Sequence, residues 1–346
     1  MVLAGSIVGC AASSSPTPDA ALPARGPAPA SATAASAPGA PSQPSAAPPS
    51  TPPLGALPVT IARELDAPVR RLAIDRPPHV AALTARSVWV HDAKGWREQA
   101  LPPALASDAT LELDVFYGRD YRVRLVGHRG PPAARVPVYL RWLPGGFKAA
   151  ADELGQLGAR KSGVLVAVLG TADPEIVCLP GDACLVKRLS GWSRAGAPPD
   201  LSRLAIADGA GFAVAGKQLL KLAPDWSSAA PPGSWDRADA LFVQGTSAWV
   251  LESERDRIHR LDGSAWQTES SPLPRPRALL AVTSPEETSL WLAADGGLAR
   301  RDAGVWRRVS ELSTPVVTLA ARTSDEVWAG GAEGLFKVRL AAAAQR

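Results

Sequence analysis

The sequence predicts an all-β protein, a seven-bladed β-propeller closed by an N-terminal strand and preceded by a disordered tether rich in Ala, Pro and Ser. Three observations lead to this prediction. Short β-rich runs bounded by Gly, Pro, Asp and Ser fill the chain after residue 57. An aromatic residue opens a polar-alternating run at steps of 34 to 51 residues, close to the length of a propeller blade. Finally, the last repeat lacks one strand, and one extra strand precedes the first repeat.

The chain begins with a short apolar segment that has no Lys or Arg before Cys10, unlike the basic start of a complete secretion signal. Residues 1–9 are apolar or small, and Ile7-Val8-Gly9-Cys10 resembles the lipobox of bacterial lipoproteins. This resemblance implies cleavage before Cys10 and attachment of a diacylglycerol, with fatty acids such as palmitate, to its thiol, which anchors the protein to a membrane. The alternative is a plain disordered tail that contains one cysteine. We assign 1–9 to a truncated signal segment, 10–57 to a linker and 58–346 to the propeller.

The linker lacks the residues that build a core, because positions 11–57 are nearly all Ala, Pro, Ser, Thr and Gly. Such a composition predicts disorder. A coil of 47 residues spans roughly 35–40 Å, which suits a tether between a lipid and a folded body. No later apolar run approaches the ~18 residues of a membrane helix.

Four strands can be assigned to each complete repeat. The fifth repeat is the clearest, and the sixth and seventh follow the same pattern, although the seventh ends after three strands. A strand over 58–64 precedes the first repeat and is expected to supply the missing outer strand, which would otherwise leave an exposed sheet edge. The strands expected in the fifth repeat are 238–245, 247–253, 257–263 and 265–271.

Two aromatic columns accompany these strands. The first opens the outer strands, and in three repeats an aspartate precedes it by four residues, in the hairpin where a carboxylate can accept turn amides. The second column is expected to pack between blades. The first column is Trp96, Phe147, Trp192, Trp226, Trp266 and Trp306, its aspartates are Asp92, Asp262 and Asp302, and the second column is Trp249, Trp291 and Trp328.

Two further cysteines, Cys178 and Cys184, flank a Leu-Pro-Gly-Asp-Ala turn between two β-rich runs. The hairpin places the thiols opposite each other, and in an oxidising compartment they are expected to form a disulfide. A zinc site would need two more ligands nearby, and the sequence offers none.

Segments 283–306 and 323–338 resemble repeats of propeller lipoproteins from GC-rich Gram-negative bacteria. The family pattern is Ser-x-x-Asp-Val-Trp-Ala, a glycine turn, and Asp-Gly-x-x-Trp. The resemblance covers the fifth to seventh repeats well and the second to fourth only through their outer aromatic residue. It implies a propeller anchored by lipid in the cell envelope, in the outer membrane, and it brings no established chemistry.

Charge and motifs favour binding over catalysis. The net charge is +4 with both signs interspersed, which argues against nucleic-acid binding. The four histidines show no metal-ligand spacing, and no nucleophile elbow or phosphate loop occurs, so we predict no catalytic, cofactor-binding or metal-binding residue. The expected protein is a non-enzymatic monomer that binds or scaffolds a protein or envelope glycan. The alternatives are a lyase-like or glycosidase-like envelope enzyme and a sensory or regulatory propeller.

The loops between second and third strands are expected to form one rim of the ring, because these loops all lie on one face of a propeller. The binding residues predicted on this rim are His128, Arg129, Lys217, Glu252, Arg255, Arg257, Asp295 and Glu333.

Overall fold

The computed structural model describes residues 54–341, apart from gaps at 75–78, 119, 151–154, 156, 158–164, 169–174, 189–190, 208, 224, 245–246, 284–287 and 324. Cys10, the predicted signal segment and most of the predicted linker therefore lie outside the described residues. Within the described part, no helix is long and apolar enough to cross a membrane.

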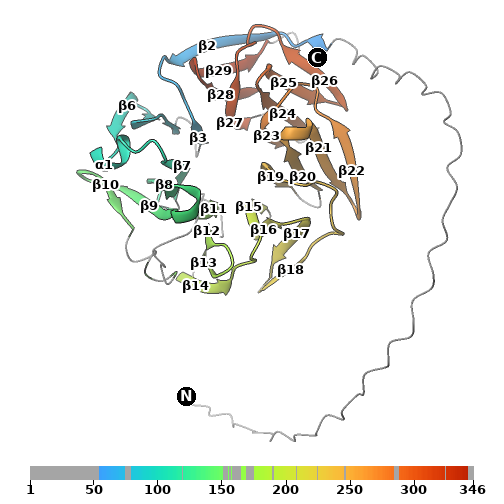
Figure 1. The fold of residues 1–346 in the computed structure, drawn as a ribbon. Coiled ribbons are helices and arrows are strands. Elements are labelled where there is room, and N and C mark those ends of the chain that lie inside the picture. The colour runs from blue at the N-terminus through green and yellow to red at the C-terminus, as the bar shows by residue number, and fades with distance from the viewer. Residues whose placement is uncertain are drawn as a thin grey trace, which may run out of the picture. The chain divides into compact units, whose positions relative to one another are not determined.

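Seven sheets of four antiparallel strands each form the folded body, one of them extended by a short parallel strand, and they follow one another around a ring (Figure 1). Blades 1 to 3 come first in the chain. Blade 1 contains β3 (Arg71–Ile74), β4 (Val80–Leu83), β5 (Ser87–Asp92) and β6 (Gly95–Ala100). Blade 2 contains β7 (Glu112–Tyr117), β8 (Val123–Arg129), β9 (Val136–Leu143) and β10 (Gly146–Ala149). Blade 3 contains β11 (Val166–Val168), β12 (Glu175–Leu179), β13 (Ala183–Arg188) and β14 (Gly191–Gly196).

Blades 4 to 7 repeat this order. Blade 4 contains β15 (Leu201–Ala207), β16 (Ala210–Ala215), β17 (Gln218–Leu222) and β18 (Trp226–Ser228). Blade 5 contains β19 (Ala240–Gln244), β20 (Ser247–Glu252), β21 (Arg257–Asp262) and β22 (Ala265–Ser270). Blade 6 contains β23 (Pro276–Thr283), β24 (Thr288–Ala294), β25 (Gly297–Asp302) and β26 (Val305–Val309). Blade 7 contains β27 (Val316–Thr323), β28 (Glu326–Gly331), β29 (Gly334–Leu340) and β2 (Val59–Leu65).

The helical elements whose bounds the described residues define are short connections. The helix α1 (Pro103–Ala106) lies between blades 1 and 2, and 3₁₀ turns occur at Pro132–Ala134 and Ser253–Arg255. The predicted all-β, seven-bladed propeller is therefore confirmed.

The N-terminal strand closes the ring as expected. The strand β2 pairs antiparallel with β29, with Thr60 opposite Arg339 and Ile61 opposite Val338. In Figure 1 the blue strand β2 lies beside the red strand β29, so the two ends of the propeller chain meet in one blade. This pairing gives blade 7 its fourth strand and covers an edge that would otherwise expose unpaired backbone groups.

Blade 6 also receives part of the N-terminal segment. The short strand β1 (Gly55–Ala56) pairs parallel with β26, and the backbone N–H of Leu57 donates to the carbonyl of Arg308 over 2.8 Å. The Leu57 side chain is 2% exposed within the core between blades 6 and 7. Residues 54–57, which the sequence analysis placed in the linker, thus pack on the propeller.

The hydrophobic core is divided among the contacts between neighbouring blades. One cluster joins each pair, for example Ile176 and Val186 of blade 3 with Ala213 of blade 4. The last cluster joins blade 7 to blade 1 through Trp328 and Val80. Because neighbouring blades share these clusters, opening the ring would expose apolar side chains of two blades to water.

Both tryptophan columns are confirmed. Trp249, Trp291 and Trp328 lie on second strands, are at most 5% exposed, and pack against the following blade. The outer aromatic residues open the fourth strands, where Trp96, Trp266 and Trp306 lie partly buried over the clusters.

The aspartates of the hairpins behave differently from one another. Oδ1 of Asp92 accepts the Lys94 backbone N–H over 2.8 Å, which is the expected turn contact. This hydrogen bond is the main cause that lowers the pKa of Asp92. Asp302 instead binds the Ser289 hydroxyl and Arg300 Nε, each over 2.7 Å. The repeat therefore fixes the position of the carboxylate, while its partner depends on the neighbouring strand.

The cysteine pair lies where the hairpin predicts. Cys178 of β12 is directly opposite Cys184 of β13, their Cα atoms are 4.0 Å apart, and a disulfide joins them. Both side chains are fully buried between blades 3 and 4.

Candidate binding site at the channel mouth

The innermost strand of each blade begins at the face that carries the loops between second and third strands. Glu112, the first residue of β7, is opposite His128 near the end of β8, which shows this arrangement in blade 2. At the start of β15, β23 and β27 the register with the second strand shifts by one residue. Such bulges redirect side chains, and the residues at the shifts are Ser202, Arg277 and Val317.

These strand starts surround a cavity of about 430 Å³ at the mouth of the central channel. All seven innermost strands contribute lining residues, for example Leu72 of β3, Val166 of β11 and Thr318 of β27. A second cavity, also of about 430 Å³, adjoins the first over blades 1, 2 and 7 and shares Arg71, Glu112, Leu113 and Val317 with it. Its other lining residues include Val69, Leu83 and Leu101.

Ion pairs fix two of the arginines at the mouth. Arg71 Nε donates to Asp114 Oδ1 over 2.5 Å, joining blade 1 to blade 2. Arg277 binds Asp295 with two parallel hydrogen bonds of 2.8 and 2.9 Å. This bidentate pair raises the pKa of Arg277 and lowers the pKa of Asp295, with the hydrogen bonds as the main cause in each.

Asp239 contacts several residues at the mouth between blades 4 and 5. Its Oδ2 accepts the Ser253 backbone N–H over 2.8 Å, and its Oδ1 lies 3.2 Å from Arg237 Nε. Its backbone carbonyl accepts a hydrogen bond of 2.6 Å from Arg203 Nε. Nη1 of Arg203 donates to the Ser202 carbonyl, also over 2.6 Å.

His128 is the one histidine among the cavity's lining residues within the described chain. It is 6% exposed, and its Nε2 lies 3.5 Å from Glu112 Oε2. Burial is the largest influence and lowers the pKa of His128, although Glu112 acts in the opposite direction. The imidazole is therefore neutral near pH 7.

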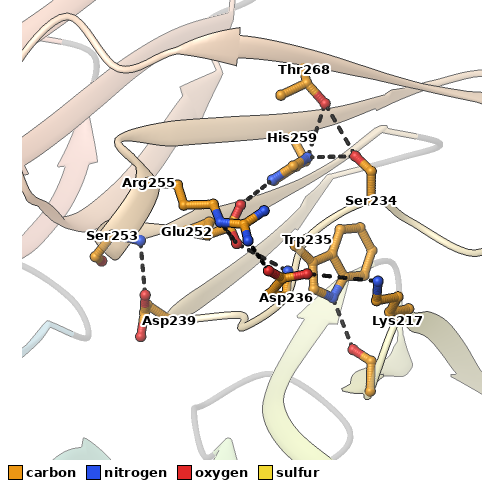
Figure 2. A network of polar contacts seen from close by, with 11 residues as sticks. Lys217, Ser234, Trp235, Asp236, Asp239, Glu252, Ser253, Arg255, His259 and Thr268 are labelled. Carbon is orange, nitrogen blue, oxygen red and sulfur yellow. Dashed lines mark hydrogen bonds and ion pairs between the residues drawn. The ribbon is translucent and has the colours of Figure 1, made fainter. Parts of the chain in front are cut away.

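A polar network lies beside the mouth, between blades 4 and 5, and Figure 2 shows it from close by. Its centre is His259, which is fully buried, with Nε2 3.2 Å from Glu252 Oε2 and Nδ1 3.0 Å from the Thr268 hydroxyl. A carboxylate can only accept, so Nε2 carries the proton and Nδ1 accepts from Thr268. The Ser234 hydroxyl lies 3.4 Å from the same Nδ1.

The network fastens the loop that leads from blade 4 into blade 5. The backbone N–H of Asp236 donates to Glu252 Oε1 over 3.0 Å, and the Asp236 carboxylate pairs with Arg255 and Lys217. Trp235, which is fully buried, donates its indole N–H to the Gly216 carbonyl over 2.9 Å. The buried Glu252 carboxylate thus has several donors, which burial of such a group requires.

The order hydroxyl, imidazole, carboxylate is also that of hydrolytic triads. Here neither His259 nor Thr268 lines a described cavity at the mouth. The contacts of His259 instead hold β20, β21, β22 and the loop together, and this role follows directly from the geometry.

The eight predicted rim residues separate into three groups. His128 lines the cavity, and Asp295 positions the cavity residue Arg277. Lys217, Glu252 and Arg255 belong to the polar network. Arg129 and Arg257 are exposed at strand ends, and the Glu333 carbonyl accepts from Arg63.

Sequence reasoning missed the charged residues at the starts of the innermost strands. Arg71, Asp114, Arg203, Asp239 and Arg277 all line the cavity. One signal was available, because Arg-Leu-Ala-Ile occurs twice, at 71–74 and at 203–206, and in both places the arginine points to the mouth. Within the described chain, no three side chains of His, Cys, Asp or Glu gather closely enough to hold a metal ion.

Comparison with known proteins gives relatives in structure alone. No protein-family model and no curated protein matches the sequence. Catalytically inactive virginiamycin B lyase from Staphylococcus aureus with Quinupristin aligns with a TM-score of 0.59 at 12% identity, over 82% of this chain and 100% of that one. YCF48 from Cyanidioschyzon merolae aligns with a TM-score of 0.55 at 16% identity, over 81% and 98%.

A third similar structure is PorZ, a surface component of the type-IX secretion system of Porphyromonas gingivalis. It aligns with a TM-score of 0.51 at 12% identity, over 81% of this chain and 38% of that one. At these identities the similarity establishes the propeller fold, which enzymes and non-enzymatic proteins share.

Proposed function

We propose that this protein is a non-catalytic lipoprotein of the bacterial cell envelope that binds a partner protein through the channel-mouth face. The observation that supports this proposal is the cavity lined by all seven blades, in which ion pairs and backbone contacts hold the charged side chains in place. A surface fixed in this way loses little conformational entropy when it binds.

A protein partner fits this face better than a glycan does. The adjoining cavity over blades 1, 2 and 7 is lined mainly by aliphatic side chains such as Val69, Leu83 and Leu101, which suit apolar amino-acid side chains. A propeller of the same fold has been solved as YCF48 bound to D1 peptide, with a TM-score of 0.53 at 15% identity, over 84% of this chain and 99% of that one. This supports a peptide ligand for the fold without identifying the ligand of this chain.

Site-specific photo-crosslinking tests the binding role. A photoreactive amino acid would replace Arg129 or Arg257, which are exposed on the mouth face, or Val305, which is 58% exposed on the outer strand of blade 6. Irradiation of intact bacteria should give discrete protein adducts from the first two positions and none from the third. Equal adducts from all three positions, or none from Arg129 and Arg257, would refute the proposal.

A further inference from the structure

The arginine side chains that line the mouth are paired with carboxylates, with one exception in the described chain. The arrangement leaves Arg203 without a carboxylate within 4.0 Å, because its two hydrogen bonds go to backbone carbonyls. The pairs formed by the other two arginines are Arg71 with Asp114 and Arg277 with Asp295.

The two carbonyl contacts hold the Arg203 guanidinium in one orientation. Nε–H and one Nη1–H are used by Asp239 and Ser202, and the described residues provide no acceptor for Nη2. Arg203 lines the cavity, so a guanidinium with unused donors borders the space that a ligand would occupy. Carbonyl oxygens fix the group without neutralising its charge.

Electrostatics agree with an incompletely compensated charge. Burial is the largest influence and lowers the pKa of Arg203, while Asp239 and Asp114 oppose it from a distance. An arginine nevertheless keeps its proton in proteins, so the mouth holds one positive charge with no direct counter-ion.

We propose that Arg203 anchors a single carboxylate of a peptide bound in the channel mouth, an inference that rests on the proposed binding function. The planar fork of a guanidinium matches a carboxylate. One negative charge balances one free arginine, whereas the nearby Asp114, Asp239 and Glu112 disfavour a dianion such as phosphate. Val166 and Leu241, on the strands that flank β15, provide an apolar wall for the neighbouring side chain.

Small probes separate the possible sources of the carboxylate. Isothermal titration of the full chain would compare N-acetyl-L-leucine, which has an α-carboxylate, with N-acetyl-L-aspartic acid α-amide, which has only a side-chain carboxylate. N-acetyl-L-leucinamide is the neutral control, and glucuronate tests a sugar acid. The expected result is binding of at least one amino-acid carboxylate, with N-acetyl-L-leucinamide about 10-fold weaker or more.

Variants test whether Arg203 is the residue that binds the carboxylate. Arg203→Gln should weaken carboxylate binding about 10-fold or more, because a charge-assisted hydrogen bond is lost. Arg203→Lys keeps the charge but not the fork and should weaken it less. The matched control Arg307→Gln removes an exposed arginine on the outer strand of blade 6 and should leave the affinity unchanged. Equal affinity in Arg203→Gln, or equal affinity for acid and amide, would overturn the inference.

Because Arg203 also links blades 4 and 5, a second measurement uses the unchanged protein. The Arg203 side-chain Nε–H resonance should shift as N-acetyl-L-leucine or the aspartate probe is added, and an unmoved resonance at saturation would overturn the inference. Preference for glucuronate would overturn the peptide assignment. If the carboxylate probes do not bind but crosslinks from Arg129 and Arg257 still form, this inference is refuted and the proposed binding function is not. Carboxylate binding without crosslinks would instead refute the partner role.

Discussion

Nε2 of His259 lies 3.2 Å from Oε2 of Glu252, and both side chains are buried at the edge of the channel mouth. Arg255 approaches the same carboxylate with Nε 3.7 Å from Oε1, and Arg257 also acts on the imidazole. Burial is the largest cause that lowers the pKa of His259, although Glu252 opposes it. The same holds for His128, where burial outweighs Glu112.

These two histidines predict a loss of stability in mild acid. Their pKa values in the folded protein lie below the ordinary histidine value of 6.5, so the unfolded chain binds more protons as the pH falls. The stabilisation is fully present above about pH 6.5 and decreases as the pH falls towards the folded values. The melting temperature, measured from pH 8 to pH 5, should therefore fall once the pH is below about 6.5.

A variant identifies the groups responsible. Replacing His259 by Gln keeps a donor for Glu252 and removes the titrating imidazole, so the variant should melt lower at pH 8 but show a shallower decline in acid. A melting temperature that stays constant from pH 7.5 to 5.5 in the unchanged protein would contradict the prediction.

A test of the disulfide by alkylation requires unfolded protein, because both Cys178 and Cys184 are fully buried. In denaturant, neither thiol should react with an alkylating agent until a reductant is added, as measured by mass. Replacing both cysteines by Ala should lower the free energy of unfolding by about 2 kcal/mol, the value for closing so short a loop. Two alkylated thiols without reductant would show that the pair is not oxidised in the isolated protein.

Successively longer N-terminal deletions should lower the stability of the propeller only when they reach β1 and β2. Deleting residues 11–50 leaves β1 and β2 intact and should not change the melting temperature. Deleting 11–57 removes β1 and the buried Leu57, whose burial is worth about 1.5–3 kcal/mol, and should lower it. Deleting 11–66 removes β2 and should cause a large drop or aggregation. Equal melting curves for the shortest and longest deletions would refute closure by β2.

Alanine substitutions at two glycines of blade 6 distinguish the cost of a steric clash of the added Cβ from the cost of a left-handed backbone. Gly297 has φ +108°, and a Cβ there would lie 2.1 Å from the Leu312 carbonyl oxygen. Gly304 has φ +82°, but a Cβ added there would meet no atom within 4 Å. Gly304→Ala should cost on the order of 1–2 kcal/mol from its left-handed backbone. Denaturant unfolding should show Gly297→Ala to be clearly more destabilising, and equal losses would argue against the crowding.

Acylation of Cys10 is tested in bacteria that produce the full chain. A labelled fatty acid should be incorporated into the protein, and Cys10→Ala should abolish the label and release the protein from the membrane fraction. The double Cys178→Ala and Cys184→Ala variant is the control and should keep the label. Label that persists in Cys10→Ala would exclude this anchor.

The sequence by itself predicted seven blades within a range of six to eight, and it also predicted the closing strand and the cysteine pair. Each depends on features local in the chain, namely strand length, alternation and the hairpin between Cys178 and Cys184. The outer and second-strand tryptophans marked the same positions in successive repeats, so counting them was enough to place Trp291 and Trp328 in the core.

The tertiary structure alone decided the composition of the channel mouth. Its charged residues extend from Arg71 to Arg277 along the chain, and only ring closure brings them around one cavity. Side chains alternate between the two faces of a strand, so the one-residue shifts at Arg277 and next to Arg203 change which residues face the channel. A sequence pattern does not reveal such shifts, because they depend on how each innermost strand pairs with its neighbour.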